Sequence, residues 1–215
     1  WCDIVTFTGS GSGTKTVSHS LGSVPGMIIV KGINSGSDWS VYHRKLNGGS
    51  SPENYYVSLN HTDGESNAVA NWGGTAPTAT QFTVGGNANG SINYVAYIFA
   101  HDDASFGTGG NESIISCGSY TGNGSTTGPV IDLGFEPQWL LVKRTNAARG
   151  WIMGDMMRGA PVGSNGERLF ANTNGSESND NEVFTPTPTG FTFQTNSAGV
   201  NGSGDTYIYM AIRRP

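Results

Sequence analysis

The second half of the chain repeats the first half, and this repeat constrains the fold more than any single motif. Residues 7–11, Phe-Thr-Gly-Ser-Gly, recur as Tyr-Thr-Gly-Asn-Gly at 120–124. Residues 21–31 recur at 133–143, where Leu-Gly-x-x-Pro precedes an apolar run that ends in Val-Lys in both copies. Further matches follow in the same order: Asn34 with Asn146, Trp39 with Trp151, Asn60 with Asn172, 65–67 with 177–179, 77–83 with 186–192 and Tyr94 with Tyr207.

These matches lie at a nearly constant spacing of roughly 110 positions, so the chain reads as two copies of one unit. Each unit has roughly 105 residues, which suits a small β-sandwich domain. We predict a first unit over residues 1–106 and a second over 107–215.

The composition favours strands and turns over helices. Glycine accounts for 33 of the 215 residues, and Asn, Ser and Thr are abundant. The residues with high helix propensity, such as Ala, Leu, Lys and Glu, are scarce by comparison. The predicted fold class is therefore all-β, with two tandem homologous β-sandwich units of the jelly-roll or lectin-like kind.

Short apolar runs, separated by Gly, Asn, Ser and Pro clusters, predict the strands. In the first unit we expect strands at 4–8, 27–33, 39–43, 55–59, 81–84 and 93–100. In the second unit we expect them at 114–121, 138–145, 150–155, 169–171, 190–195 and 206–213. The continuous apolar runs 27–30 and 139–142 are typical of strands that are buried on both faces or that lie in a sandwich core. No amphipathic helix is expected, and residues 155–158 can form one turn at most.

Charge and hydropathy disfavour two kinds of partner. Charged residues make up 13% of the chain and the net charge is -5, which argues against a nucleic-acid ligand. The sequence has no apolar run of about 18 residues, so we expect no membrane insertion. Cys2 and Cys117 occupy nearly equivalent positions, and two reduced thiols are a simpler expectation than a bridge between the units. Because the chain begins at Trp1 without a signal-peptide pattern, we expect a processed chain or part of a longer one.

One tryptophan is a candidate ligand contact. Trp72 follows Asn71 and precedes two glycines, in a segment that reads as a loop and has no equivalent in the second unit. An aromatic side chain in a polar loop can contact a ligand, although local packing explains it as well. Trp39 and Trp151 recur with the repeat itself, so we assign them to the core.

Two matching polar segments supply the other candidate ligand-binding residues. They are Asn60, Asp63, Glu65 and Asn67 in the first unit, and Asn172, Glu177 and Asn179 in the second. Such oxygen-rich loops can hold calcium, but the spacing is not that of an EF-hand, and turns built on Asx hydrogen bonds explain the composition equally well. We therefore predict no metal and no cofactor. The polar loops 34–38, 47–54, 60–72 and 172–181 are the candidate binding surfaces.

No motif points to catalysis. The four histidines, His19, His43, His61 and His101, show no metal-binding spacing, and neither a nucleophile elbow nor a P-loop is present. A glycosidase needs two carboxylates about 5–10 Å apart, which a sequence does not reveal. We predict a protein that is not an enzyme.

The ordered set of motifs resembles a domain of tailed-bacteriophage virion proteins, those of cyanophages included. The resemblance rests on Tyr/Phe-Thr-Gly-x-Gly, on Leu-Gly-x-x-Pro with its apolar strand, on Trp-x-Val-Tyr-His at 39–43 and on Tyr-Val-Ala-Tyr-x-Phe-Ala at 94–100. It covers nearly the whole chain, and only the two termini depart from the pattern. The resemblance implies a component of tail-fibre-like or structural proteins, located in the virion, and it carries over no catalytic residues.

Three functions remain open at this point. The first is a tail-fibre or tail-associated module that attaches to host surface polysaccharide, with other virion proteins and a homo-oligomer, preferably a trimer, as partners. The second is a purely structural capsid decoration or head-fibre protein, for which exposed aromatic and methionine side chains at 55–56 and 153–157 are the expected contacts. The third is a polysaccharide depolymerase, which requires carboxylates gathered in a groove.

Overall fold

The computed structural model describes residues 1–101, 105, 108–159 and 165–214. The all-β prediction is confirmed, because strands dominate and the helical elements are single turns. Those turns are η1 (Leu46–Gly49), η2 (Pro52–Asn54), α1 (Val69–Trp72), η3 (Gly86–Ala88) and η4 (Met156–Arg158). Among the described residues, no helix has the length and apolarity needed to cross a membrane.

The first half forms a large and a small antiparallel sheet. The large sheet has the order β1 (Cys2–Thr8), β8 (Asn93–Phe99), β3 (Met27–Gly32), β4 (Ser40–His43), β5 (Tyr55–Ser58) and β6 (Ser66–Asn67). The small sheet pairs β2 (Thr14–Ser18) with β7 (Gln81–Gly85), and β2 is a strand that the sequence pattern did not predict. Side chains from β2, β7 and α1 enclose a core against one face of the large sheet.

The second half has the same plan. Its large sheet has the order β14 (Ser178–Asp180), β13 (Gly166–Phe170), β12 (Ile152–Asp155), β11 (Pro137–Arg144), β17 (Thr206–Arg213) and β9 (Ile115–Thr121). The small sheet consists of β10 (Ile131–Asp132), β16 (Gly190–Thr192) and β15 (Thr185–Thr187). The predicted boundary between residues 106 and 107 lies outside the described residues, and the jelly-roll or lectin-like assignment of each unit stays a prediction.

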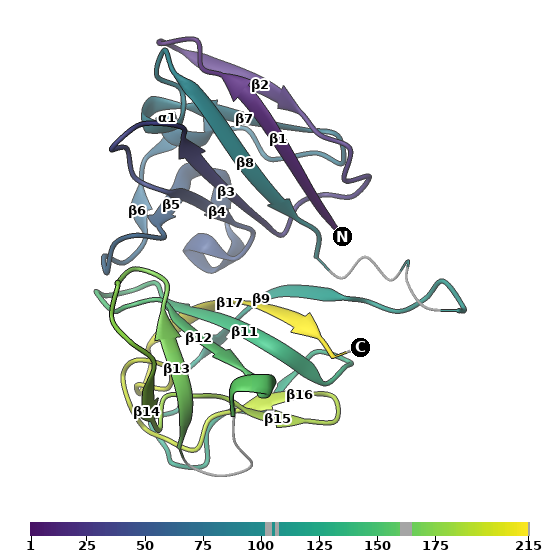
Figure 1. Cartoon of the computed structure of the whole chain (residues 1–215), viewed down its shortest axis with the longest axis vertical. Coiled ribbons are helices and arrows are strands. Elements are labelled where there is room, and N and C mark those ends of the chain that lie inside the picture. The colour runs from purple at the N-terminus through teal and green to yellow at the C-terminus, as the bar shows by residue number, and fades with distance from the viewer. Residues whose placement is uncertain (102–104, 106–107, 160–164, 215) are drawn as a thin grey trace.

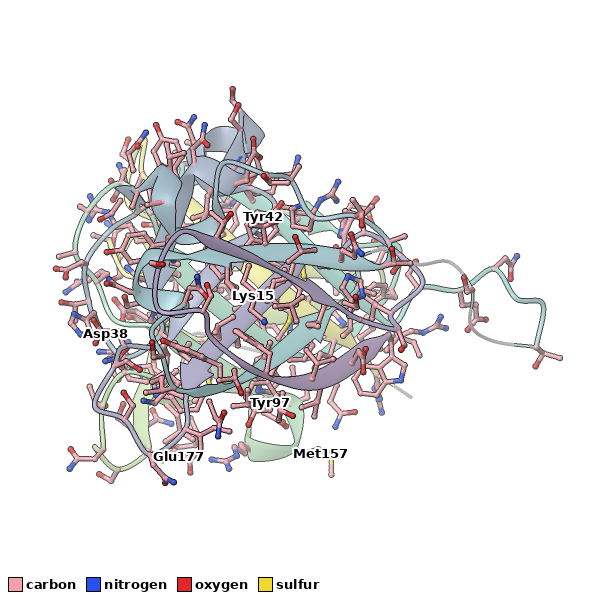
Figure 2. The ribbon with its side chains drawn as sticks, turned by 90° about the horizontal axis from the view of Figure 1, so that it is seen from above. Lys15, Asp38, Tyr42, Tyr97, Met157 and Glu177 are labelled. Atoms are coloured by element: carbon pink, nitrogen blue, oxygen red, sulfur yellow. The ribbon has the colours of Figure 1, made fainter. Side chains whose placement is uncertain are left out.

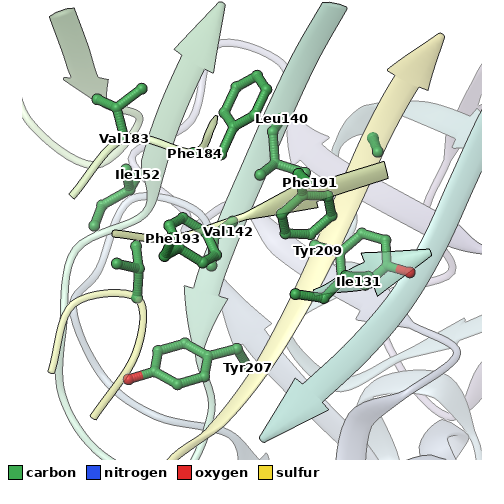
Figure 3. Close-up of a cluster of buried hydrophobic side chains, with 12 residues drawn as sticks. Ile131, Leu140, Val142, Ile152, Val183, Phe184, Phe191, Phe193, Tyr207 and Tyr209 are labelled. Carbon is green, nitrogen blue, oxygen red and sulfur yellow. The ribbon is translucent and has the colours of Figure 1, made fainter. Parts of the chain in front are cut away.

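Aromatic rings fill the core of the second half (Figure 3). Phe191 of β16 packs edge-on against Tyr209 of the large sheet, with ring centroids 5.3 Å apart. Corresponding rings stack in both halves: Phe7 lies 5.2 Å from Tyr94, and Tyr120 lies 4.9 Å from Tyr207. The matching sequence segments therefore build matching pieces of core.

The outer faces of the two large sheets pack against each other, with the first half above the second in Figure 1. In β3 the side chains alternate: Ile28 and Val30 point into the core of the first half, while Met27 and Ile29 point toward the second half. Both faces of this strand are buried, which is one of the two interpretations that its continuous apolar run allowed. The shared cluster contains Met27, Ile29, Val41, Leu46 and Val57 from the first half and Ile115, Cys117, Leu141, Trp151, Ile208 and Met210 from the second.

Polar contacts complete the junction between the halves. The indole N–H of Trp151 donates to the backbone oxygen of Ser58 at 2.8 Å. The buried Nζ of Lys143 donates to the backbone oxygen of Thr62 at 3.1 Å, and burial lowers the pKa of Lys143 to about 8. Because both donors are satisfied by the other half, their burial does not leave polar groups unpaired.

Each half contacts the other through the outer face of its own large sheet, but the two halves use different parts of these corresponding faces. Cys117 of β9 is fully buried by the first half, whereas Ile4, its counterpart in β1, is 59% exposed. Conversely, Met27 of β3 is buried, whereas its counterpart Trp139 in β11 is only half-buried. The contact is therefore heterologous rather than two-fold symmetric, and part of the face in each half stays open. Cys2 and Cys117 are both free thiols.

The shared cluster predicts that the halves unfold together. Leu46 is buried at the junction, and Leu46→Ala should lower the free energy of unfolding by about 2–5 kcal/mol. Val69→Ala is the matched control, because Val69 is 47% exposed and its truncation should cost within about 0.5 kcal/mol. Urea denaturation followed by both fluorescence and circular dichroism measures this. Two separate transitions, or equal losses in the two variants, would contradict the shared core.

His43 makes the stability of the junction depend on pH. Its Nε2 hydrogen-bonds with the backbone oxygen of Tyr209 at 3.0 Å, and burial lowers its pKa from 6.5 to about 3, with the charges of His101, Arg44 and Lys45 adding to the shift. Between these two pH values the unfolded chain binds a proton that the folded chain does not, so acidification favours unfolding. The contribution is therefore complete above pH 6.5 and is lost as the pH falls toward about 3.

We expect His43→Gln to reduce the slope of unfolding free energy against pH in this window. The measurement is urea denaturation at a series of pH values on the wild type and the variant. Equal slopes would show that His43 does not carry this dependence.

Candidate functional site

The structure corrects the placement of Trp72 and Asn71. The segment forms a turn of helix, α1, and not an exposed loop. Trp72 is 2% exposed and packs edge-on against Tyr42, with centroids 5.9 Å apart. Asn71 is buried beside it. Trp72 is therefore a core residue, and its ring has no free face for a ligand. The physical reason is that burial of the large indole ring stabilises the fold, whereas exposure in a loop would not.

Asn60 and Asn172 perform the same structural task in the two halves. The amide oxygen of Asn60 accepts the backbone N–H of Trp39 at 2.9 Å, and that of Asn172 accepts the backbone N–H of Trp151 at 2.8 Å. Each asparagine thus ties its loop to the strand that follows the tryptophan. The amide oxygens are occupied, which explains why both positions recur with the repeat.

The other candidates of the first half do not converge on one site. Asp63 is exposed and lies 3.6 Å from His61. Glu65 accepts the backbone N–H of Asn47 at 2.7 Å, and burial raises its pKa above the ordinary value. Asn67 is exposed on the edge strand β6. Within the described residues, no three His, Cys, Asp or Glu side chains are grouped as a metal site requires.

Two of the predicted polar loops meet in an open cavity of about 490 Å³, which we call the loop cavity. It lies beside the junction of the two halves. The first half contributes Thr62 from loop 60–72, and the second contributes residues from loop 172–181 and from β12 and β13. The lining residues are Thr62, Arg149, Gly150, Ile152, Arg168, Phe170, Asn172, Thr173, Asp180, Asn181, Glu182 and Ser197.

A network of ion pairs forms one wall of the loop cavity. Arg168 pairs with Asp180 at 2.8 Å and with Glu182, and Ser197 donates a hydrogen bond to the same glutamate. Arg149 lies 3.9 Å from Glu182. The Arg168 and Glu182 side chains are only 11% and 10% exposed, so their charges are held in place by each other.

The remaining surface of the loop cavity is polar and nearly neutral. Two arginines balance two carboxylates, and amides and hydroxyls from Asn172, Asn181 and Thr173 lie around them. Ile152 and Phe170 supply an apolar patch, and the Arg168 guanidinium lies 4.7 Å from the centre of the Phe170 ring. Such a surface can exchange hydrogen bonds with a hydroxyl-rich ligand without favouring a charged one.

Glu177 and Asn179 belong to the opposite face of β13. Glu177 pairs with Arg158 at 3.1 Å, and the Asn179 amide donates to Glu167 at 3.1 Å. Figure 2 shows Glu177 at the rim of the molecule. Glu177 also lines a smaller groove of about 210 Å³, the sheet groove, whose other residues are Trp139, Met153, Gly154, Asp155, Arg158, Glu167 and Leu169.

The sheet groove lies where the heterologous junction covers the sheet face only partly: Trp139 and Met153 line it and also pack against the shared cluster. Trp139, Met153 and Leu169 correspond to Met27, Val41 and Val57, which the second half buries.

Residues 2–214 match the family described as Domain of unknown function (DUF7483). The chain belongs to the DUF7483 family. No curated protein and no solved structure matches the chain.

Several residues of this DUF7483 protein's loop cavity could not be found from sequence. Arg149, Arg168, Glu182 and Ser197 come from four separate segments, and no spacing rule connects them. The pairing of β13 with β14 brings Arg168 near Asp180, and the fold of the following loop supplies Glu182. A sequence signal existed for the two polar loops 60–72 and 172–181, which were predicted as candidate binding surfaces.

The buried network predicts a large difference between two glutamates. Glu182→Ala leaves Arg168 without one of its two partners and should cost about 3–5 kcal/mol of unfolding free energy. Glu177→Ala breaks a pair whose side chains are 37% and 54% exposed, and should cost about 1 kcal/mol or less. Denaturant unfolding of both variants measures the difference. Equal costs would show that the Arg168 network is not structural.

Proposed function

We propose that the chain is a non-catalytic, glycan-binding module of a tailed-phage virion, in a tail fibre or tail-associated protein that attaches to host surface polysaccharide. The observation that carries the binding part is the loop cavity. Two of the four polar loops predicted from sequence contribute to it, one from each half of the chain.

The chemistry of the loop cavity suits neutral sugar residues. Sugar hydroxyls donate and accept hydrogen bonds, and the cavity offers amides, hydroxyls, guanidinium groups and carboxylates within about 490 Å³. That size falls within the range of about 300–1,000 Å³ that is common for small-ligand sites. The ion pairs hold the wall rigid, which reduces the entropy lost on binding.

The virion part of the proposal rests on the resemblance to tailed-phage virion proteins. A fibre carries several copies of each module, and a trimer would present three loop cavities to one surface. Weak binding at each copy is then enough for stable attachment.

A second candidate is a purely structural role as a capsid decoration or head-fibre protein. The observation that favours it is a set of exposed apolar side chains, which includes Ile4, Val130 and Met157. Figure 2 shows Met157 at the edge of the molecule, where a neighbouring subunit could cover it. Tyr55 and Tyr56 are partly buried in the fold and are weaker candidates for such contacts.

Two rim variants test the glycan site. Thr173→Ala and Asn181→Ala remove exposed polar groups from the loop cavity, and each should weaken binding to host polysaccharide at least about tenfold. The control is Asn179→Ala, an exposed asparagine whose amide donates to Glu167 instead. Biolayer interferometry on immobilised polysaccharide, with the protein in solution, gives the affinities.

Three outcomes would overturn the assignment of the loop cavity: no binding to the polysaccharide, equal binding by all variants, or loss of binding only in Trp139→Ala, which would assign the ligand to the sheet groove. Gold-labelled antibody imaging of the phage particles tests the virion part separately. Label at the tail end supports attachment, label over the capsid supports the structural role, and unlabelled particles contradict both.

A further inference from the structure

A second cavity, of about 500 Å³, lies at the junction of the two halves and away from the loop cavity. The first half contributes Arg44, Lys45 and His101, and the second contributes the edge strand β9 and the segment that follows β10. We call it the cationic cavity, and its lining residues with polar side chains are Arg44, Lys45, His101, Ser116, Ser119, Asp132 and Tyr209.

Arg44 is unusual among the arginines of this protein. Each of the other six has a carboxylate within 4.0 Å: Arg144, Arg149, Arg158, Arg168, Arg213 and Arg214. Across the described part of the chain, Arg44 forms no ion pair with a carboxylate, and neither does Lys45 or any other lysine. In a chain of net charge -5, an arginine that has no carboxylate partner among the described residues and that is followed directly by a lysine therefore stands out.

The two cations are not part of the repeated framework. Their counterparts in the second half are Met156 and Met157, which lie in η4. Framework positions such as Asn60 and Asn172 keep the same residue and the same hydrogen bond in both halves. The pair at 44–45 is therefore a feature of this cavity and not a requirement of the fold.

Among the described residues that line the cationic cavity, Asp132 is the one carboxylate, and the others add hydrogen-bonding groups. His101 Nδ1 accepts the backbone N–H of Cys117 at 2.9 Å, which fixes the imidazole against the edge strand β9. Ser119 of β9, which is exposed and lies on the sheet face that meets the first half, contributes a hydroxyl group. The carboxylate of Asp132 lies at the rim, where it is exposed and accepts the backbone N–H of Gly134 at 3.0 Å.

We propose that the cationic cavity binds a single oxyanion, a phosphate or carboxylate group, between Arg44 and Lys45, with the hydroxyl of Ser119 as a further donor. Arginine and lysine side chains with unused donors are the groups that hold such anions in proteins. The proposal goes beyond glycan binding at the loop cavity and uses none of its residues.

Titration with inorganic phosphate at constant ionic strength, with chloride as the competing anion, tests the site. We expect saturable binding of one phosphate per chain by calorimetry, and at least about tenfold weaker binding in Arg44→Gln and in Lys45→Gln. Lys15→Gln is the control, because it removes a lysine that does not line the cationic cavity. Lys15 is half-buried and lies on β2, in the outer layer of the first half (Figure 2). It should bind phosphate as the wild type does.

A parallel titration with glucuronate, with glucose as its neutral counterpart, separates the two sources of the anion. Binding of either anion supports the site and identifies its chemistry. Saturable binding of neither, or equal weakening in Lys15→Gln and the two cavity variants, would overturn the proposal. Thermal unfolding of each variant shows whether lost binding reflects lost folding. Thr173→Ala should still bind phosphate, so failure of the glycan site and failure of this site are distinguishable.

Discussion

The apolar contact between the outer faces of the two large sheets is the constraint on which the rest of the structure depends. A sheet covered on one face by a small sheet still exposes its other face, and burial of that face removes many apolar side chains from water. Here each half covers the other, through a cluster that runs from Met27 and Val41 to Cys117 and Met210. The polar groups at the same junction, Trp151 and Lys143, are satisfied by backbone oxygens of the first half.

The two copies meet heterologously, and this explains why the cavities differ between them. A two-fold contact would have given each half the same surroundings. Instead Leu46 is sealed in the junction, while its counterpart Arg158 borders the sheet groove. The cationic cavity likewise exists only where Arg44 and Lys45 face β9. Two halves with the same sheet plan thus have distinct surfaces because each has different neighbours.

The candidate site was only partly predictable, and the reason differs from residue to residue. Polar segments that repeat in sequence located loop 172–181, since loops of this composition lie at the surface. The structural role of Asn172 was not predicted. Its amide oxygen accepts the backbone N–H of Trp151, a contact between residues 21 positions apart that forms only in the folded chain. Trp72 was misplaced, because neighbouring glycines indicate a loop while the energy of burying an indole ring favours the core. Arg168, Glu182 and Ser197 meet only through strand pairing and loop closure, for which the sequence carries no spacing signal.

The sequence by itself determined the fold class and the positions of the main strands, because propensity and apolar periodicity act locally along the chain. It also determined that corresponding segments of the two halves form corresponding pieces of structure, as the stacked rings of Phe7 with Tyr94 and of Tyr120 with Tyr207 illustrate. Only the tertiary structure decided which half of each sheet face is covered and which cavities stay open. That choice depends on how two similar apolar faces slide and rotate against each other, and it is set by the summed packing of side chains that are distant in sequence.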